Sequence, residues 1–121
     1  MFSSLLSEPV VIEAVFAQNY PEITEVWEAS VRATHHFLSE ADIQYFKPLI
    51  LNDFLKMVDL VGIKNQKGDI IGFMGTHNDN LEMLFIHPQA IGKGLGKLFV
   101  DHAIKNLKVY KVDVNEQNLR Q

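Results

Sequence analysis

Apolar and polar positions divide the chain into segments with two different periods. The run Val10–Phe16 is β-branched and largely apolar, which predicts a first strand after a leader over residues 1–9. From Pro21 to Thr34, apolar residues recur every three or four positions, as they do on one face of a helix. Asn19 is suited to cap this helix, and Pro21 suits its first turn. The chain is therefore expected to open with a strand followed by a helix.

A second helix is expected over Glu40–Met57, where apolar residues again follow a helical period. Ser39 and Asp42 stand three residues apart at its start, which is the spacing of a capping box. Pro48 lies inside the segment and lacks the backbone N–H that a helix needs at that position. We expect the proline to bend or interrupt the helix and to leave two shorter pieces.

Short strands dominate the next part of the chain. Leu60–Lys64 and Asp69–His77 are predicted to be two strands joined by a tight turn. Leu81–Ile86 is an apolar run of strand length, and residues 109–114 alternate as a fifth strand would. Between these last two, the apolar positions of residues 98–107 return to helical spacing.

The predicted element order is β-α-α-β-β-β-α-β in a single domain over residues 10–121. Three antiparallel strands come before one right-handed parallel crossover through the third helix. The predicted fold class is therefore α/β, with a mixed parallel and antiparallel sheet of the kind found in α+β proteins.

A glycine stands at every second position from Gly92 to Gly96, where the fourth strand gives way to the third helix. The first amides of a helix have no intrahelical partner, and the aligned peptide dipoles place partial positive charge there. Glycines let a bulky phosphate approach the backbone, and Lys93 and Lys97 add positive charge. The pattern predicts a phosphate or pyrophosphate site, with a tight turn that binds nothing as the alternative.

The composition of the chain excludes several classes of function. With 121 residues, 47% hydrophobic and 21% charged, the chain has room for one soluble domain with one core. The net charge of −4 gives no support to nucleic-acid binding, and the absence of cysteine excludes disulfides and thiolate sites. No apolar run reaches the roughly 20 residues of a membrane span, and the leader lacks the basic start of a signal peptide. We expect a cytoplasmic protein with no nucleic-acid or membrane partner, and no metal site.

The glycine pattern excludes two common phosphate motifs. In a P-loop, Ser or Thr follows the lysine, where this chain has Leu98. The dinucleotide fingerprint is G-x-G-x-x-G, whereas Gly92, Gly94 and Gly96 form G-x-G-x-G. The segment resembles instead the signature R/Q-x-x-G-x-G/A of the GCN5-related N-acetyltransferases, with Gly94 and Gly96 as its glycines. Ile91 stands at the Arg or Gln position, a departure that removes a side chain usually found beside the phosphates.

The resemblance covers about residues 10–121 and implies the acyl-CoA N-acyltransferase fold, with acetyl-CoA as cosubstrate. In that family the fourth strand pairs its backbone with the pantetheine arm beside a bulge, and the glycine loop holds the pyrophosphate. The acetyl group passes directly to an amine of a small molecule or protein. The resemblance assigns to the cofactor Leu84, Phe85, Ile86, Ile91, Gly92, Lys93, Gly94, Leu95, Gly96, Lys97 and Asn118.

The resemblance also suggests catalytic residues. Glu82 lies on the fourth strand, where many members carry a glutamate that acts as general base through water, and Asn80 is placed to orient that water. His35 lies at the break between the first two helices, which borders the acceptor site in the family, and histidine suits proton transfer. A solvated carboxylate and a surface histidine are the alternatives for Glu82 and His35.

Members of the family continue through a fourth helix and two further strands, whereas this chain ends at Gln121, where that helix begins. On this comparison the C-terminal helix and last two strands are missing, and the fifth strand lacks its usual neighbour. An open sheet edge invites pairing with another chain, so we expect a homodimer through this edge. The missing part also motivates a second hypothesis, a catalytically impaired remnant that binds CoA. A third hypothesis is an α/β interaction module with an empty glycine turn.

Overall fold

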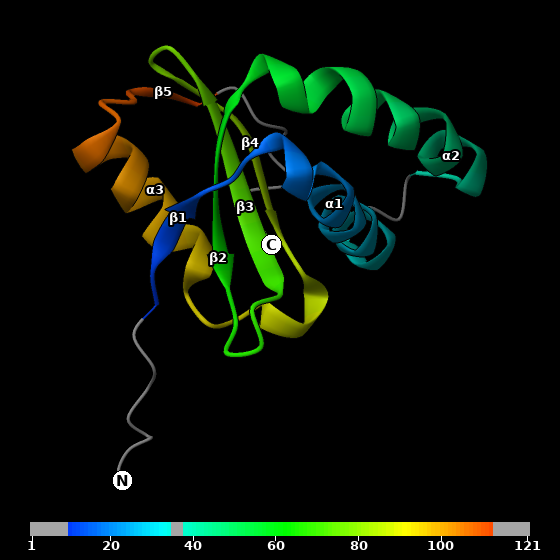
Figure 1. Cartoon of the computed structure of the whole chain (residues 1–121), viewed down its shortest axis with the longest axis horizontal. Helices are drawn as coiled ribbons and strands as arrows, with labels where there is room; N and C mark the ends of the chain where they lie inside the picture. The colour runs from blue at the N-terminus through cyan, green and yellow to red at the C-terminus, as the bar shows by residue number, and fades with distance from the viewer. Residues whose placement is uncertain (1–9, 35–37, 113–121) are drawn as a thin grey trace, which may run out of the picture.

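Helices cover both faces of a single sheet (Figure 1). The computed structural model describes residues 10–34 and 38–112. Along the chain its helices and strands are β1 (Ile12–Ala14), α1 (Tyr20–Thr34), α2 (Glu40–Leu49), β2 (Asp59–Lys64), β3 (Ile70–His77), β4 (Asn80–Ile86), α3 (Leu95–Asn106) and β5 (Lys111–Val112). Short 3₁₀ turns at Ala17–Asn19, Leu55–Met57 and Pro88–Ala90 and a π-helical turn at Ile50–Phe54 connect them. None of the described helices combines the length and apolar character needed to cross a bilayer.

The five described strands follow one another across the sheet in the order β1-β2-β3-β4-β5. Every neighbouring pair is antiparallel except β4 and β5, which run parallel because α3 carries the chain back to the same end of the sheet. The predicted element order and mixed sheet are therefore confirmed. The first strand is shorter than predicted, and the fifth begins two residues later, at Lys111; the rest of the predicted fifth strand lies outside the described residues.

The two faces of the sheet carry separate cores. On one side α1 and α2 pack on the sheet, and on the other side α3 does (Figure 1). Side chains alternate along β4, so that Met83 and Phe85 join the α1–α2 core while Leu84 and Ile86 join the α3 core. Phe73 and Phe99, both fully buried, lie at the centres of the two cores.

Pro48 changes the hydrogen-bonding pattern of the second helix, as expected. The proline has no N–H to donate, and the α-helix ends at Leu49. The next turn is a π turn in which the Leu55 N–H reaches the Ile50 carbonyl, five residues back. The predicted helix over residues 40–57 is thus an α-helix followed by a π and a 3₁₀ turn.

The two predicted helix caps had different outcomes. The capping box of α2 is confirmed, because the Asp42 N–H donates to Ser39 Oγ at 3.1 Å and the Ser39 N–H donates to Asp42 Oδ2 at 3.0 Å. Asn19 instead stands at the end of the 3₁₀ turn before α1, and its Oδ1 accepts from the Phe16 N–H at 3.1 Å. The Asn19 side chain therefore closes the 3₁₀ turn that precedes α1, because this turn places the Phe16 N–H within hydrogen-bonding distance of Oδ1.

Candidate functional site

A bulge interrupts β4 at Glu82. Thr76 of β3 pairs with Leu81, and the neighbouring Gly75 pairs with Met83, so that Glu82 has no partner opposite it. An extra residue of this kind bends a strand and increases its local twist. Among the described residues, β4 pairs with β5 at Asn80 and Leu81, just before this bulge. The bulge that the family resemblance implied on this strand is present.

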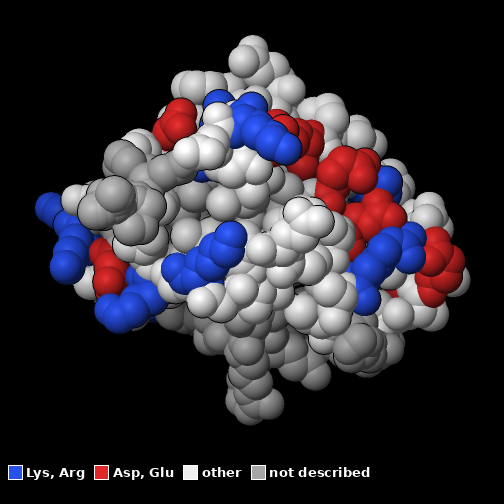
Figure 2. Space-filling view, turned by 90° about the horizontal axis from the view of Figure 1, so that it is seen from below, with Lys and Arg blue, Asp and Glu red and all other residues white. Residues whose placement is uncertain are grey.

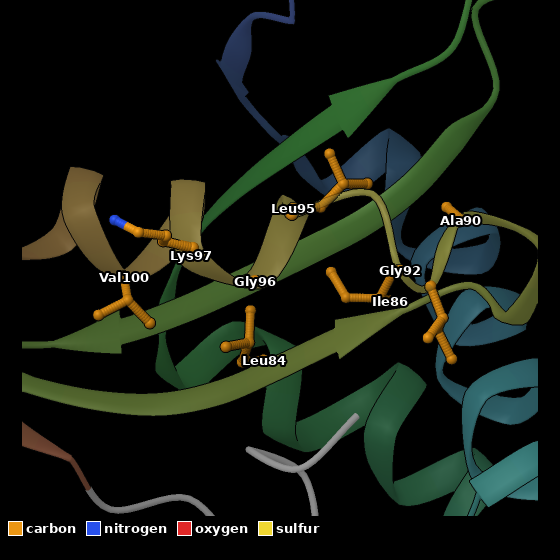
Figure 3. A pocket seen from close by; sticks show the side chains of 10 residues that line it. Leu84, Ile86, Ala90, Gly92, Leu95, Gly96, Lys97 and Val100 are labelled. Atoms are coloured by element: carbon orange, nitrogen blue, oxygen red, sulfur yellow. The ribbon is translucent and has the colours of Figure 1, made fainter.

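A cavity of about 510 Å³ opens between β4 and the start of α3. Leu84 and Val100 point toward each other across it, from the strand and the helix (Figure 3). The cavity is lined by Leu84, Ile86, Ala90, Ile91, Gly92, Gly94, Leu95, Gly96, Lys97 and Val100. Its wall is therefore largely apolar on the strand side, with glycines and one lysine at the loop.

The glycine loop leaves space that the protein itself does not fill. Gly92 and Gly94 have φ angles of +90° and +79°, a left-handed conformation that favours glycine. Gly96 has ordinary helical geometry, so its backbone does not require glycine. A Cβ built on any of the three would have no neighbouring heavy atom within 4 Å. At Gly96, therefore, neither conformation nor packing within the described residues explains the absence of a side chain, and a bulky ligand could approach the backbone there.

The start of α3 offers backbone donors beside this space. The first intrahelical hydrogen bond runs from the Leu98 N–H to the Gly94 carbonyl at 3.2 Å. The N–H groups of Leu95, Gly96 and Lys97 precede it, and among residues 10–34 and 38–112 no protein acceptor is recorded for them. Unpaired amides and the helix dipole favour an anion at this end. The loop thus has the donor set and the open space that a phosphate group requires.

Most of the predicted cofactor residues meet at this cavity. Lys93 lies exposed in the loop and does not line the cavity. The Phe85 side chain points to the side of the sheet opposite the cavity, where its ring stacks on Phe73 with the centroids 5.6 Å apart. Asn118 lies outside the described residues. Sequence reasoning missed Ala90 and Val100, although Val100 stands one helical turn after Gly96, on the same face of α3.

The catalytic residues predicted on β4 lie on the other side of the sheet. Asn80 Nδ2 donates to Glu82 Oε2 at 2.7 Å, so the two side chains share one side. Leu81, between them, belongs to the α3 core, and neighbours on a strand alternate, so the pair faces α1 and α2. Glu82 is half-buried. His35 lies outside the described residues.

An ion-pair network joins α1 to α2 on either side of the segment that contains His35. Arg32 contacts Glu28 at 2.8 Å and Glu40 at 2.6 Å, and Lys47 contacts Glu28 at 2.6 Å and Glu25 at 3.2 Å. The hydrogen bond from Arg32, with a second from Gln44, lowers the pKa of Glu40 to about 2. Hydrogen bonds from Lys47 and Arg32 also lower the pKa of Glu28.

The parallel strand β5 is anchored through the turn between β3 and β4. The N–H groups of Tyr110 and Lys111 donate to the Asp79 carbonyl at 3.1 and 3.2 Å. The Tyr110 hydroxyl also donates to the Asp79 carboxylate, which lowers the pKa of Asp79 and raises that of Tyr110. Within the described residues, no group of three or more His, Asp or Glu side chains is arranged to hold a metal ion.

Comparison with known proteins places this architecture. No protein-family model matches the chain. The chain is 35% identical over 97 residues to the peptidyl-lysine N-acetyltransferase YjaB of Salmonella typhimurium, covering 80% of this chain and 66% of that protein. It is 34% identical to YjaB of Escherichia coli, covering 80% of this chain and 65% of that protein. The chain thus spans just under two thirds of the length of these curated relatives.

Solved structures agree with this relationship. The solution structure of apo YjaB from Escherichia coli superposes with a TM-score of 0.77 at 29% identity, covering 93% of this chain and 76% of that one. The PaiA N-acetyltransferase from Thermoplasma acidophilum, in complex with coenzyme A, has a TM-score of 0.67 at 20% identity, covering 84% and 73%. The second match shows the fold alone. With the glycine loop, the bulged fourth strand and the parallel fifth strand, the chain belongs to the GCN5-related N-acetyltransferase family.

Proposed function

We propose that this protein transfers an acetyl group from acetyl-CoA to a primary amine, and that a lysine side chain of a protein is its acceptor. The observation that carries this proposal is the cavity at the start of α3, where three helix amides with no acceptor among the described residues adjoin open space at Gly94 and Gly96. The curated relatives, named for peptidyl-lysine acetylation, support the choice of acceptor.

The residues at the cavity fit the cosubstrate in charge and shape. The amides of Leu95, Gly96 and Lys97 would hold the pyrophosphate, because they present donors at the positive end of the α3 dipole. Leu84 and Ile86 would line the path of the pantetheine arm on the strand side. Bound acetyl-CoA would supply an activated thioester at the strand end of this path.

Glu82 would serve the acceptor from the opposite side of β4. The acceptor amine is protonated near neutral pH and must lose a proton before it can attack a carbonyl carbon. Glu82 is half-buried at the bulge and would accept that proton, directly or through water. The hydrogen bond from Asn80 Nδ2 holds one carboxylate oxygen in place, which orients the other.

A thermal-shift series at Gly96 tests the cofactor site. Wild-type protein should gain about 2.7 kcal/mol of stability at a CoA concentration one hundred times the Kd. Gly96→Val should lose this gain, because a branched side chain would occupy the space beside the amides. Gly96→Ala is the matched control: it should keep most of the gain, and the free protein should be up to about 1 kcal/mol more stable because alanine favours the helix. An unchanged ligand effect in Gly96→Val would overturn the site.

Thiol release separates the enzyme from the CoA-binding remnant. Purified protein is incubated with acetyl-CoA and a lysine-containing peptide, and free thiol is measured with time. Release that depends on the peptide supports acetyl transfer. Stabilisation by CoA with no release across a panel of peptides and small amines would favour the remnant. A cytoplasmic location and a homodimer through the sheet edge stay predictions of this proposal, the second to be tested by light scattering.

A further inference from the structure

The outward side of α3 combines lysines with exposed apolar residues. With 3.6 residues per turn, the exposed positions from Lys97 to Lys105 fall within one arc of the helix, and Lys108 lies just past its end. Leu98 is 41% exposed, Ile104 is 56% exposed and the Lys97 side chain is 81% exposed. This surface, called the lysine face here, consists of Lys97, Leu98, Asp101, Ile104, Lys105 and Lys108.

The lysine face is the basic side of an acidic protein. Residues 91–112 contain five lysines and one aspartate, whereas residues 20–57 contain six acidic and three basic residues. Figure 2 shows this division, with basic side chains predominating on the side of α3 and acidic ones gathered on the side of α1 and α2. The aspartate, Asp101, pairs with Lys97 at 3.2 Å, and an exposed pair of this kind is weak. Lys105 and Lys108 have no ion pair with a described residue.

A cofactor bound at the glycine loop does not account for the far end of this face. Lys105 stands 11 residues after Gly94, roughly 16 Å along the helix axis, and Lys108 lies beyond the end of the helix. At that distance through solvent, salt screens most of their attraction to a phosphate at the loop. Lys97, in contrast, belongs both to the cavity and to the lysine face. The face is therefore continuous with the cavity but extends well beyond it.

We propose that the lysine face docks an acidic acyl carrier protein, which presents an acyl thioester on its 4′-phosphopantetheine arm. The proposal rests on the proposed function, because the arm would enter the same cavity and its single phosphate would meet the same helix amides. Carboxylates of the carrier would pair with Lys105 and Lys108, and Leu98 and Ile104 would meet its apolar residues. Complementary charge of this kind gives specificity and fast association.

The experiment uses the whole chain labelled with ¹⁵N and a recombinant acidic acyl carrier protein. The carrier is added in its holo form, with the phosphopantetheine arm, and in its apo form. We expect chemical-shift changes confined to α3 and the glycine loop with the holo carrier, and to α3 alone with the apo carrier. The affinity, measured by calorimetry, should fall at high salt because the contacts are between exposed charges.

Charge reversal locates the docking surface. The double variant Lys105→Glu, Lys108→Glu should bind the holo carrier with an affinity at least about tenfold lower than that of the wild type. Lys56→Glu with Lys67→Glu changes net charge equally at exposed sites outside α3 and should leave the affinity within about twofold. Both double variants should keep the stabilisation by free CoA, because neither changes the cavity.

Three results would overturn the docking proposal: no shift with the holo carrier, equal loss of affinity in the two double variants, or binding to anionic phospholipid vesicles in place of the carrier. If free CoA still stabilises the wild-type protein in such a case, the proposed function stands and only the docking surface fails. If neither free CoA nor the carrier binds, the proposed function fails as well.

Discussion

The two faces of the sheet differ in how completely they are packed, although the same strands form both. On the α1–α2 side, Phe85 stacks on the fully buried Phe73, and ion pairs of Arg32 and Lys47 tie the two helices together. On the α3 side, Leu84 lines a cavity. The loop that leads into α3 is rich in glycine, so it has few side chains to fill this space.

The difference shows where stability and binding are separated in this molecule. The α1–α2 side is filled and cross-linked by the protein's own groups, whereas the α3 side leaves donors and space for a ligand. A change in the α1–α2 core should therefore alter folding, and a change at the cavity wall should alter binding. The bulge at Glu82 is the exception, since it puts a candidate catalytic group on the filled side.

The largest effect is expected from that exception. Glu82→Gln keeps the size of the side chain but cannot accept the acceptor's proton, so the rate of acetyl transfer should fall by about 10²- to 10⁴-fold. The stabilisation by CoA should not change, because the cavity lies on the other side of β4. Steady-state rates with a lysine peptide and thermal shifts with CoA measure the two quantities. A variant that retains its full rate would remove Glu82 from the proposal.

Truncating a side chain to alanine should lower the free energy of unfolding more in the α1–α2 core than at the cavity wall. Phe73→Ala removes a fully buried ring on the α1–α2 side and should cost about 3–5 kcal/mol in urea unfolding. Val100→Ala, at the half-buried cavity wall, should cost about 1 kcal/mol or less. Equal losses in the two variants would mean that the cavity side is packed as tightly as the other.

Placing the arginine of the family signature at Ile91 should raise the affinity of the cavity for CoA. Ile91 lines the cavity and is half-buried against the α3 core. Ile91→Arg should strengthen CoA binding by about 1 kcal/mol, roughly fivefold, because a guanidinium would pair with the phosphates. Calorimetry measures the change, and Ile91→Leu is the control of similar volume. Affinity that stays the same or falls would indicate that the cofactor's phosphates lie away from Ile91.

The smallest effect is expected from the ion pairs between α1 and α2. The pKa of Glu40 is lowered in the folded state from 4.5 to about 2, chiefly by Arg32. A lowered pKa stabilises the fold above about pH 4.5, and this contribution is lost as the pH falls toward 2. Because the carboxylate is exposed, the contribution is small. Urea unfolding from pH 5 to pH 2 should show a shallower loss of stability in Glu40→Gln than in the wild type, and parallel curves would argue against the pair.

Local signals were sufficient for much of this molecule. The strand and helix order, the capping box of Ser39 and the interruption at Pro48 all follow from spacings of a few residues, and each is present. The glycine loop was likewise visible, because glycine at Gly92 and Gly94 reflects a backbone conformation that is local to those residues.

Composition and spacing by themselves thus determined the elements, their order and the place of the glycine loop, since short-range backbone preferences decide these. Only the tertiary structure decided that Ala90 and Val100 complete the cavity and that Phe85 turns away from it. It also decided that the bulge falls at Glu82. These features depend on the register between β3 and β4 and on how α3 packs across the sheet, which join residues distant in sequence.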